Sequence, residues 1–370
     1  MSSAPAIKQI AITTGGGDAP GLNAVIRAVV LSALGRGWRC LGIREGYNGL
    51  LEPDDYPDGG VIEITRESVK GIAHLGGTIL GTTNQGNPVS YPVRGEDGVI
   101  FEVDRTDELI KAFRRHQIDA VVAIGGDGSL SIANVLAEKG LRVVGVPKTI
   151  DNDLHQTVIT FGFDTAVSFA TLCLDRLHST AESHQRVMVV EVMGRYAGWI
   201  ALSVGISGSA DAILMPEIPY DMKNVAEKIL EGEARGKKYA IVVVAEGAKP
   251  IGGTRSILED EVGHEERLGG IGEKVAVELN ALTGKQTRTV VLGHLLRGGS
   301  PTTFDRLISL RFGAAAIRAL EEGQEGVMVA LDPPNVRYVP LKEVVRGLKV
   351  VPLDSDTITT ARDLGISFGD

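Results

Sequence analysis

The sequence predicts an α/β protein with mainly parallel sheets in a doubly wound arrangement. Short apolar runs alternate along the chain with Gly-rich turns and helix-like segments, which is typical of successive βα units. The apolar runs are continuous, as expected of parallel strands whose sheet is covered on both faces. The chain has 370 residues, of which 43% are hydrophobic and 23% are charged, so it is an ordinary globular sequence with room for about two domains.

The expected elements follow in chain order. The first strand is expected at residues 7–13 and its helix at 20–34, with Pro20 in the first turn and Gly35 after the end. Later strands are expected at 119–124, 142–146, 187–192, 238–245 and 287–292. Later helices are expected at 129–139, 164–182, 195–204, 265–282 and 303–321. Two stretches rich in Gly and charge, 87–98 and 249–272, are expected to be surface loops.

Charge and composition exclude several classes of protein. Lys and Arg number 38 and Asp and Glu 47, which gives a net charge of −9. This balance argues against general binding to nucleic acid or to anionic membranes, so an anionic ligand needs a local cluster of cations. No leader peptide is indicated, and the longest apolar run is too short to span a membrane, so a cytoplasmic protein is expected. Cys40 and Cys173 are expected to be reduced thiols.

The first motif, Thr14-Gly-Gly-Gly-Asp-Ala-Pro-Gly-Leu-Asn23, joins the first strand to the first helix. Glycines let backbone N–H groups approach a bulky anion, and the helix N-terminus adds partial positive charge. The string matches neither GxGxxG nor a Walker A loop, and it could be an ordinary tight turn. However, such turns lie at the carboxyl ends of strands, where open α/β sheets bind ligands. The motif therefore favours a phosphate site.

The second motif, Ile124-Gly-Gly-Asp127-Gly128-Ser129, also leads from a strand to a helix. Gly126 and its neighbour allow close approach of phosphate, and Asp127 can hold Mg²⁺ directly or through water. Gly128 leaves open a space that a larger residue would fill. Ser129 can cap the helix or bind phosphate. Similar strings occur in nucleotide and lipid kinases, so this motif alone is only moderately specific.

The third motif is Pro147-Lys148-Thr149-Ile150-Asp151-Asn152-Asp153, which we place after a strand. One carboxylate can take the proton from an attacking hydroxyl, and the other can order metal or substrate. Lys148 can offset phosphate charge. An Asp-Asn-Asp turn could equally be an ordinary surface turn, but three such turns in one chain favour phosphoryl transfer.

Cations gather next to strand ends. Arg186 precedes a strand that ends in Met193-Gly194-Arg195, and Arg288 begins a strand that ends in Gly-His294-Leu-Leu-Arg297. A single Arg at a strand end is usually solvated. Four arginines and a histidine so placed in an acidic protein predict a phosphate pocket. Glu246, which follows another strand, is a candidate partner for sugar hydroxyls, although it could be an exposed loop acid.

Six strings in one order resemble the 6-phosphofructokinase family: GGDAPG, GGDGS, TIDND, SHQR, EVMGR and GHxxRGGSP. The resemblance implies two Rossmann-like three-layer α/β/α domains with the active site in the cleft between them. It also implies Mg²⁺-dependent transfer of a phosphoryl group to the 1-hydroxyl of fructose 6-phosphate by a homo-oligomer, usually a tetramer. The donor domain is expected at residues 1–162 and 295–345. The fructose 6-phosphate domain is expected at 163–294 and 346–370.

The resemblance also implies roles for single residues. Asp151 looks like the base that activates the sugar hydroxyl, and Arg195 looks like a stabiliser of the transferred phosphoryl group. Thr149 and Asp153 look like partners at the reacting centre. The residues expected at the donor and Mg²⁺ are Gly16, Gly17, Tyr47, Asn84, Gly126, Asp127, Gly128, Ser129 and Lys148. Those expected at fructose 6-phosphate are Thr149, Asp151, Met193, Gly194, Arg195, Glu246, His294 and Arg297, with Arg186 and Arg288 reaching into a neighbouring subunit's site.

Departures from the family pattern bear on the donor. Asn84 stands where the bacterial ATP enzymes have a phosphate-bridging Arg, so another cation must supply that charge, and Lys148 is the candidate. Lys at position 148 is typical of pyrophosphate-dependent members and also occurs in an ATP-using branch. The pyrophosphate enzymes usually carry Asp where Gly128 stands, and that carboxylate would repel an ATP α-phosphate. Gly128 removes an obstruction, so ATP is the expected donor and pyrophosphate the alternative.

Two hypotheses of other kinds remain open. A sugar-phosphate-binding regulatory protein without catalysis is disfavoured by the presence of Asp127, Asp151 and Asp153. A more distant kinase acting on NAD or lipid is disfavoured because the arginines at the strand ends would have no clear use there. No nucleic-acid partner and no membrane partner is expected.

Overall fold

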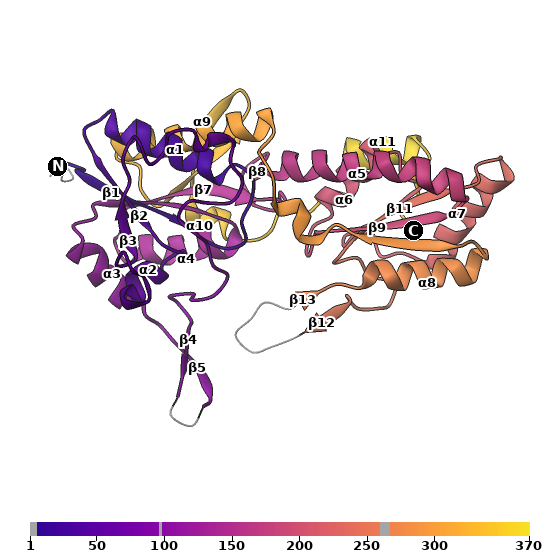
Figure 1. Cartoon of the computed structure of the whole chain (residues 1–370), viewed down its shortest axis with the longest axis horizontal. Coiled ribbons are helices and arrows are strands. Elements are labelled where there is room, and N and C mark those ends of the chain that lie inside the picture. Colours follow the sequence, from indigo (N-terminus) through magenta and orange to yellow (C-terminus); the bar gives the residue numbers. More distant parts are fainter. Residues whose placement is uncertain (1–5, 96–97, 260–266) are drawn as a thin grey trace. The chain divides into compact units, whose positions relative to one another are not determined.

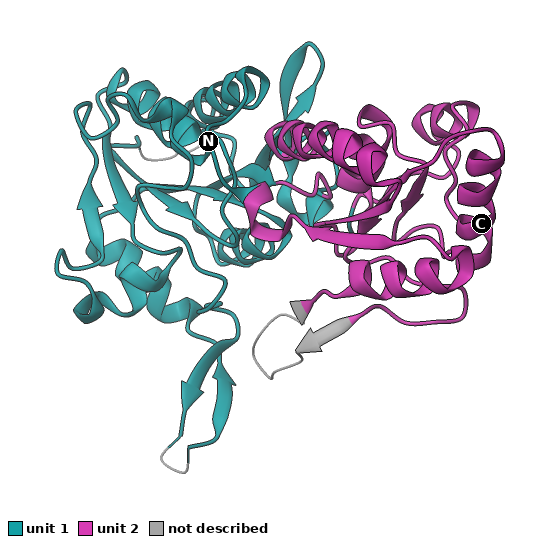
Figure 2. Ribbon diagram, turned by 45° about the vertical axis from the view of Figure 1, so that its right-hand side comes forward, with its two compact units in different colours: residues 1–149, 154–162, 297–348 teal, residues 150–153, 163–296, 349–370 magenta. Residues whose placement is uncertain are grey.

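A computed structural model of the chain describes residues 6–95, 98–259 and 267–370. The chain divides into two compact units, coloured separately in Figure 2, and each unit combines a mainly parallel sheet with helices. The predicted α/β class is therefore confirmed. Unit 1 comprises Met1–Thr149, Leu154–Gly162 and Arg297–Leu348, and unit 2 comprises Ile150–Asp153, Phe163–Leu296 and Lys349–Asp370.

Unit 1 is built on a sheet with the strand order β16-β15-β7-β6-β1-β2-β3, in which β8 also pairs with β7. The pairs from β15 to β2 are parallel, and the edge strands β3 and β16 are antiparallel to their neighbours. The carboxyl ends of β1, β6 and β7 therefore meet at one edge of the sheet. The strands are β1 (Gln9–Thr14), β2 (Arg39–Ile43), β3 (Val61–Glu63), β6 (Ala120–Gly125), β7 (Val143–Thr149), β8 (Phe161–Gly162), β15 (Val327–Asp332) and β16 (Asn335–Pro340).

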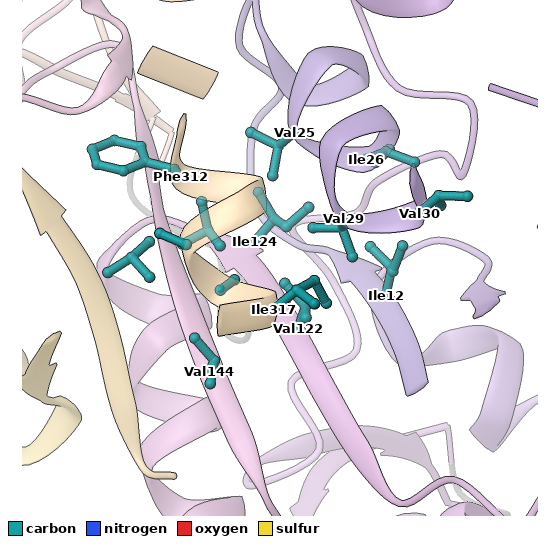
Figure 3. Close-up of a cluster of buried hydrophobic side chains, with 14 of the residues drawn as sticks. Ile12, Val25, Ile26, Val29, Val30, Val122, Ile124, Val144, Phe312 and Ile317 are labelled. Atoms are coloured by element: carbon teal, nitrogen blue, oxygen red, sulfur yellow. The ribbon is translucent and has the colours of Figure 1, made fainter. Parts of the chain in front are cut away.

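Alternate side chains of these strands enter two cores on opposite faces of the sheet. Ile10 and Ile12 of β1 pack with α1 (Leu22–Leu34) and α9 (Thr303–Glu321), as the close-up in Figure 3 shows for Ile12. Ala11 packs instead with α3 (Thr106–Arg115) and α4 (Asp127–Glu138). Figure 1 shows the two helix pairs on opposite sides of the sheet. The continuous apolar runs therefore mark strands whose side chains are buried on both faces of the sheet.

The remaining elements of unit 1 are short. A two-stranded antiparallel hairpin is formed by β4 (Tyr91–Arg94) and β5 (Ile100–Val103), so the predicted loop at 87–98 is wrong in part. The small helices are α2 (Asn48–Leu51), α10 (Leu341–Val344), η1 (Pro53–Asp55) and η2 (Ile72–His74).

Unit 2 has a four-stranded sheet of order β10-β11-β9-β14, and all its pairs are parallel. Helices α7 and α8 share a core with one face, to which Ala212 and Leu214 of β10 contribute. Gly205 of α6 packs against Ile213 on the other face. The elements are α5 (Phe163–His184), β9 (Val187–Val192), α6 (Trp199–Ser207), β10 (Ala212–Leu214), α7 (Met222–Ala234), β11 (Ala240–Ala245), α8 (Ile271–Thr283), β14 (Thr287–Val291), η3 (Gly293–Arg297) and α11 (Asp356–Asp363).

Some expected boundaries are wrong, and the reasons are local. Strand β7 runs through Lys148 and Thr149 because these residues pair with β8. Helix α4 begins at Asp127 after Gly126, so Ser129 lies inside its first turn and is not the cap. Helix α6 begins at Trp199, which leaves Arg195 in the preceding turn.

Three further expectations also need correction. Helix α8 begins after Gly270, whose φ of 75° ends the preceding segment, and not at residue 265. Residues 265–266 of that predicted helix lie outside the described part of the chain. The predicted loop at 249–272 contains β12 (Ile257–Glu259) paired with β13 (Arg267–Leu268). The parallel strands β2 and β15 were not predicted.

Cys40 and Cys173 are free thiols, and burial raises the pKa of Cys40 to about 12. Among the helices of the described ranges, none is long and apolar enough to cross a membrane.

Candidate active site

In unit 1 the Gly-rich turns after β1 and β6 pack directly on each other. The Gly15 N–H donates to the Ile124 carbonyl at 3.1 Å. Ser129 fills the space between the turns: a Cβ on Gly15 would lie 2.7 Å from its Oγ, and a Cβ on Gly125 would lie 2.2 Å from its Cβ. Only glycine fits at both positions. Packing thus places Ser129 at the start of α4, where its side chain lies beside the Gly-rich turns after β1 and β6.

A second loop braces the first turn. Gly16 has a φ of 76°, its N–H donates to the Thr83 carbonyl at 3.0 Å, and its carbonyl accepts from Thr82 Oγ1 at 2.5 Å. Asn84 follows directly and is exposed. The predicted donor residues Gly16 and Asn84 therefore belong to adjoining loops of unit 1.

Lys148 is the buried cation of this site. Its side chain is only 3% exposed, and Nζ donates to the Gly17 carbonyl. A Cβ on Gly16 would lie 3.4 Å from the same Nζ. The carbonyl of Lys148 lies 3.3 Å from where a Cβ on Gly126 would be. Lys148 therefore touches both glycine turns and places a positive charge between them.

Arg297, which was predicted among the sugar-phosphate ligands, lies against the first Gly-rich turn of unit 1. Its Nη1 donates to the Asp18 carbonyl at 3.1 Å, and a Cβ on Gly17 would lie 2.5 Å from that nitrogen. Arg297 also belongs to unit 1, whereas His294 belongs to unit 2. The guanidinium is therefore within reach of whatever anion the Gly17 turn binds.

Asp127 and Gly128 open α4, with Gly126 as the N-cap. A Cβ on Gly128 would meet no atom within 4 Å, so the space beside this residue is open. In the described ranges no three His, Cys, Asp or Glu side chains form a metal-binding group. The carboxylate of Asp127 is the kind of ligand that fits Mg²⁺, which proteins commonly hold through one or two carboxylates together with substrate phosphates.

Tyr47 is placed more deeply than a nucleotide contact requires. It is 6% exposed, its ring meets Phe113 edge-on with centroids 6.4 Å apart, and it belongs to the core below the sheet. Burial raises the pKa of its hydroxyl. Its side chain therefore supports the turn after β2 from the inside.

In unit 2 the loop Ile150–Asp153 follows directly on β7. Asn152 has a φ of 52°, a left-handed conformation that Asn tolerates better than most residues. Its side chain is buried, and its Oδ1 accepts a hydrogen bond from Lys349 Nζ at 2.8 Å. Asp151 and Asp153 flank it. The loop is thus held by a hydrogen bond to a residue 197 positions away in the sequence.

The carboxyl ends of β9 and β11 bring the next candidates together. The Glu246 N–H donates to the Val192 carbonyl at 2.9 Å, and the Gly247 N–H donates to the Gly194 carbonyl at 3.1 Å. Gly194 has a φ of 139°, which turns the chain so that Met193 and Arg195 follow the strand end. The predicted group Met193, Gly194, Arg195 and Glu246 is therefore assembled in one place.

Gly247 offers a test of this assembly. A Cβ there would lie 2.0 Å from the Arg195 carbonyl oxygen, a backbone atom that cannot move aside cheaply. We expect Gly247→Ala to lower the free energy of unfolding by about 1–3 kcal/mol. Gly232→Ala in α7 is the matched control, because its nearest atom is 4.0 Å away, and it should raise that free energy by about 0.5–1 kcal/mol. Chemical denaturation of both variants measures the difference, and similar midpoints would contradict the packing described here.

The remaining cations do not join that group. Arg186 precedes β9 and Arg288 is the second residue of β14, so both lie at the amino ends of parallel strands. Arg195, Glu246 and His294 follow the carboxyl ends. A strand of five or six residues separates the two edges by roughly 16–20 Å. Within unit 2, Arg186 and Arg288 therefore lie at the other edge of the sheet from Arg195, Glu246 and His294, so these residues do not form one pocket in a single copy of that unit.

Local contacts of these two arginines are modest. Arg186 Nε donates to Gln286 Oε1 at 2.5 Å, and Arg288 Nη1 donates to the neighbouring Thr287 carbonyl at 2.7 Å. Arg288 and His294 are exposed. Both guanidinium groups therefore lie at the amino ends of the strands of unit 2, away from the edge at which the strands' carboxyl ends meet.

Lys349 is the residue that the sequence reasoning missed. No motif surrounds it, and its position in the chain gives no hint that it meets Asn152. Burial lowers its pKa to about 8, and the nearby Asp153 charge opposes that shift. Only the folded chain identifies it.

Comparisons with known proteins identify the family. A family model described as Phosphofructokinase matches residues 9–320. The chain is 48% identical over 368 residues to ATP-dependent 6-phosphofructokinase 2 of Clostridium perfringens, covering 98% of this chain and 99% of that protein. It is 50% identical over 363 residues to ATP-dependent 6-phosphofructokinase of Chloroflexus aurantiacus, covering 98% of each.

Solved structures show the same fold. Phosphofructokinase from Saccharomyces cerevisiae matches with a TM-score of 0.78 and 28% identity, over 97% of this chain and 47% of that one, so this chain spans about half the yeast chain's length. A pyrophosphate-dependent phosphofructokinase from Marinobacter aquaeolei matches with a TM-score of 0.78 and 22% identity, over 97% of this chain and 91% of that one.

Proposed function

The chain belongs to the phosphofructokinase family, and we propose that it transfers the γ-phosphoryl group of ATP to the 1-hydroxyl of fructose 6-phosphate. The products are fructose 1,6-bisphosphate and ADP. The observation that carries the proposal is identity of 48–50% over 98% of the chain to proteins named ATP-dependent 6-phosphofructokinase. The assembled turns of unit 1 and the Asp151–Asp153 loop of unit 2 supply the groups that this chemistry needs.

The donor is assigned to unit 1. The phosphates are assigned to the Gly16–Gly17 and Gly126–Ser129 turns, and Lys148 supplies the charge that Asn84 lacks. The open space at Gly128 leaves room for the α-phosphate of ATP. Asp127 would hold Mg²⁺ together with those phosphates, and when bound the ion neutralises charge on the donor.

The groups assigned to the reaction lie on the segment that continues from β7 into unit 2. Asp151 takes the proton from the 1-hydroxyl of the sugar as the hydroxyl oxygen attacks the γ-phosphorus of ATP. The bond between that phosphorus and the ADP oxygen breaks, and ADP leaves. Thr149 and Asp153 hold the reacting centre. Arg195 stabilises the charge on the group being transferred.

Fructose 6-phosphate is assigned to Met193, Gly194, Glu246, His294 and Arg297. Arg186 and Arg288 lie at the opposite edge of the same sheet, so they serve a second copy of the chain. This placement supports a homo-oligomer, in which each subunit lends two arginines to the 6-phosphate site of its neighbour. A tetramer in the cytoplasm is the assembly that we propose.

A donor assay tests the proposed function. Formation of fructose 1,6-bisphosphate from fructose 6-phosphate and Mg²⁺ is followed with ATP and with pyrophosphate in parallel. We expect turnover with ATP. Turnover with pyrophosphate alone would reject ATP as donor and assign donor choice to Lys148 and Asn84. Binding of fructose 6-phosphate with no turnover from either donor would reject catalysis.

A further inference from the structure

Lys349 donates two hydrogen bonds to the Asp151–Asp153 loop, one from its backbone and one from its side chain. Its backbone N–H donates to the Asp153 carbonyl at 2.7 Å, and its Nζ donates to Asn152 Oδ1 at 2.8 Å. One contact is to the main chain and the other to a side chain, so the loop is held at two points. Both contacts lie within unit 2.

Lys349 is itself fixed on its other side. The indole Nε1 of Trp199 donates to the Lys349 carbonyl at 2.8 Å, and Lys349 Nζ lies 5.4 Å from the centroid of that ring. Two residues on, the Val351 N–H donates to Glu217 Oε1 at 2.9 Å, and the same carboxylate accepts the Gly198 N–H. The segment from Lys349 to Val351 is therefore anchored to the start of α6.

The loop has a physical need for this support. Asn152 is 5% exposed and adopts a left-handed backbone conformation, which costs a non-glycine residue roughly 1 kcal/mol or more. A buried amide oxygen also needs a hydrogen-bond partner. Lys349 supplies that partner, and the surrounding structure keeps the strained conformation in place.

Keeping an ammonium group here is unfavourable in itself. Burial lowers the pKa of Lys349 to about 8, so the fold carries a desolvation cost that an apolar side chain would avoid. The charge lies near Asp153, which opposes the shift. A cation retained against this cost, beside the loop that carries the proposed base, points to a role in that loop's geometry.

We propose that Lys349 is a positioning residue for phosphoryl transfer, which holds Asp151 and Asp153 in place through its contacts with Asn152 and the Asp153 carbonyl. This inference rests on the proposed function, in which Asp151 is the base. Displacement of a reacting group by about 1 Å can lower the rate by as much as 10²-fold. Loss of the side-chain contact should therefore appear in kcat more than in KM.

Steady-state kinetics of Lys349→Met tests the proposal. We expect kcat to fall by about 10- to 100-fold, with KM for ATP and for fructose 6-phosphate changed by less than about 3-fold. Lys349→Arg retains the cation and should recover most of the lost kcat. Lys274→Met makes the same change at an exposed position of α8 and should leave kcat at the wild-type value. A wild-type kcat in Lys349→Met, or equal losses in the Met and Arg variants, would overturn the proposal.

A double-mutant cycle tests the route through Asn152. Asn152→Gly keeps the backbone conformation accessible and removes the amide that Lys349 contacts. We expect this variant alone to lose at least about 10-fold in kcat, and Lys349→Met in that background to add less than about 3-fold. Full additivity, or an unchanged kcat in Asn152→Gly, would contradict the route. If the methionine variant does not fold, Asn152→Gly alone carries this test.

Amide hydrogen exchange separates this inference from the proposed activity. In Lys349→Met, peptides covering residues 149–155 should exchange at least about 10-fold faster than in the wild type, while peptides from α7 should not change. Unchanged exchange in the loop would overturn the positioning role even in an active enzyme. Wild-type protein without turnover would reject the proposed function and leave the exchange result to decide the positioning role.

Discussion

Asparagine in place of Asp151 should lower kcat by about 10²- to 10⁴-fold. The amide has nearly the shape of the carboxylate but cannot accept the proton of the sugar hydroxyl, and general-base catalysis commonly contributes this much. The other groups assigned to the two substrates remain in place and the amide keeps the shape of the carboxylate, so KM should change by less than about 3-fold. The measurement is initial-rate kinetics with ATP, Mg²⁺ and fructose 6-phosphate.

A matched control removes a charge of the same kind elsewhere in unit 2. Asp175 lies exposed on α5, so Asp175→Asn should retain wild-type kcat and KM. Thermal melting of both variants should differ little from that of the wild type, which separates loss of the base from loss of the fold. A kcat for Asp151→Asn within about 3-fold of the wild-type value would remove Asp151 from the role of base.

The sequence predicts an element well where the residues at its own ends determine where it begins and stops. Strand β9 follows the polar pair Gln185-Arg186, five of its six residues are apolar, and its predicted range is confirmed. Helix α9 begins after Thr302, whose side chain accepts the Asp305 N–H as a helix cap, and its predicted range is also confirmed. In both cases the signal lies in the element or in the residues directly next to it.

The errors arise where a distant segment sets the boundary. Lys148 and Thr149 look like turn residues, but pairing with Phe161 and Gly162 draws them into β7. Arg195 looks like the start of a helix, but the hydrogen bond between Gly194 and Gly247, which follows β11, holds it in a turn. Sequence patterns do not reveal such pairings, because the paired residues lie outside the local window in which a pattern is recognised.

The candidate site shows the same division. The Gly-rich turns after β1 and β6 could be predicted, because glycines next to apolar runs signal both the turn and the close approach of an anion. Arg186 and Arg288 were correctly seen at strand ends, yet a common pocket does not follow, since the parallel register puts them at the amino edge. Lys349 could not be found, because its partner Asn152 lies 197 positions away.

Aspartate in place of Gly128 should lower kcat/KM for ATP by at least about 10²-fold and lower that for pyrophosphate by much less. A Cβ at this position meets no atom within 4 Å, so the backbone accepts the substitution. Gly128 lies in the first turn of α4, where a carboxylate interacts favourably with the helix dipole, so the fold should not be weakened. The expected loss comes from repulsion between the new carboxylate and the α-phosphate, since like charges held close together cost several kcal/mol.

Two further variants separate charge from size. Gly128→Asn has the same volume as the aspartate variant without its charge, and Gly128→Ala adds only a methyl group. If repulsion decides the donor, kcat/KM for ATP should fall in the order Ala, Asn, Asp, with most of the loss in the last step, while binding of fructose 6-phosphate stays unchanged in calorimetry. Equal losses in the Asn and Asp variants would mean that space alone decides. An equal loss with both donors in Gly128→Asp would mean that donor choice lies elsewhere, and Lys148, buried between the two glycine turns, would then be the group that selects the donor.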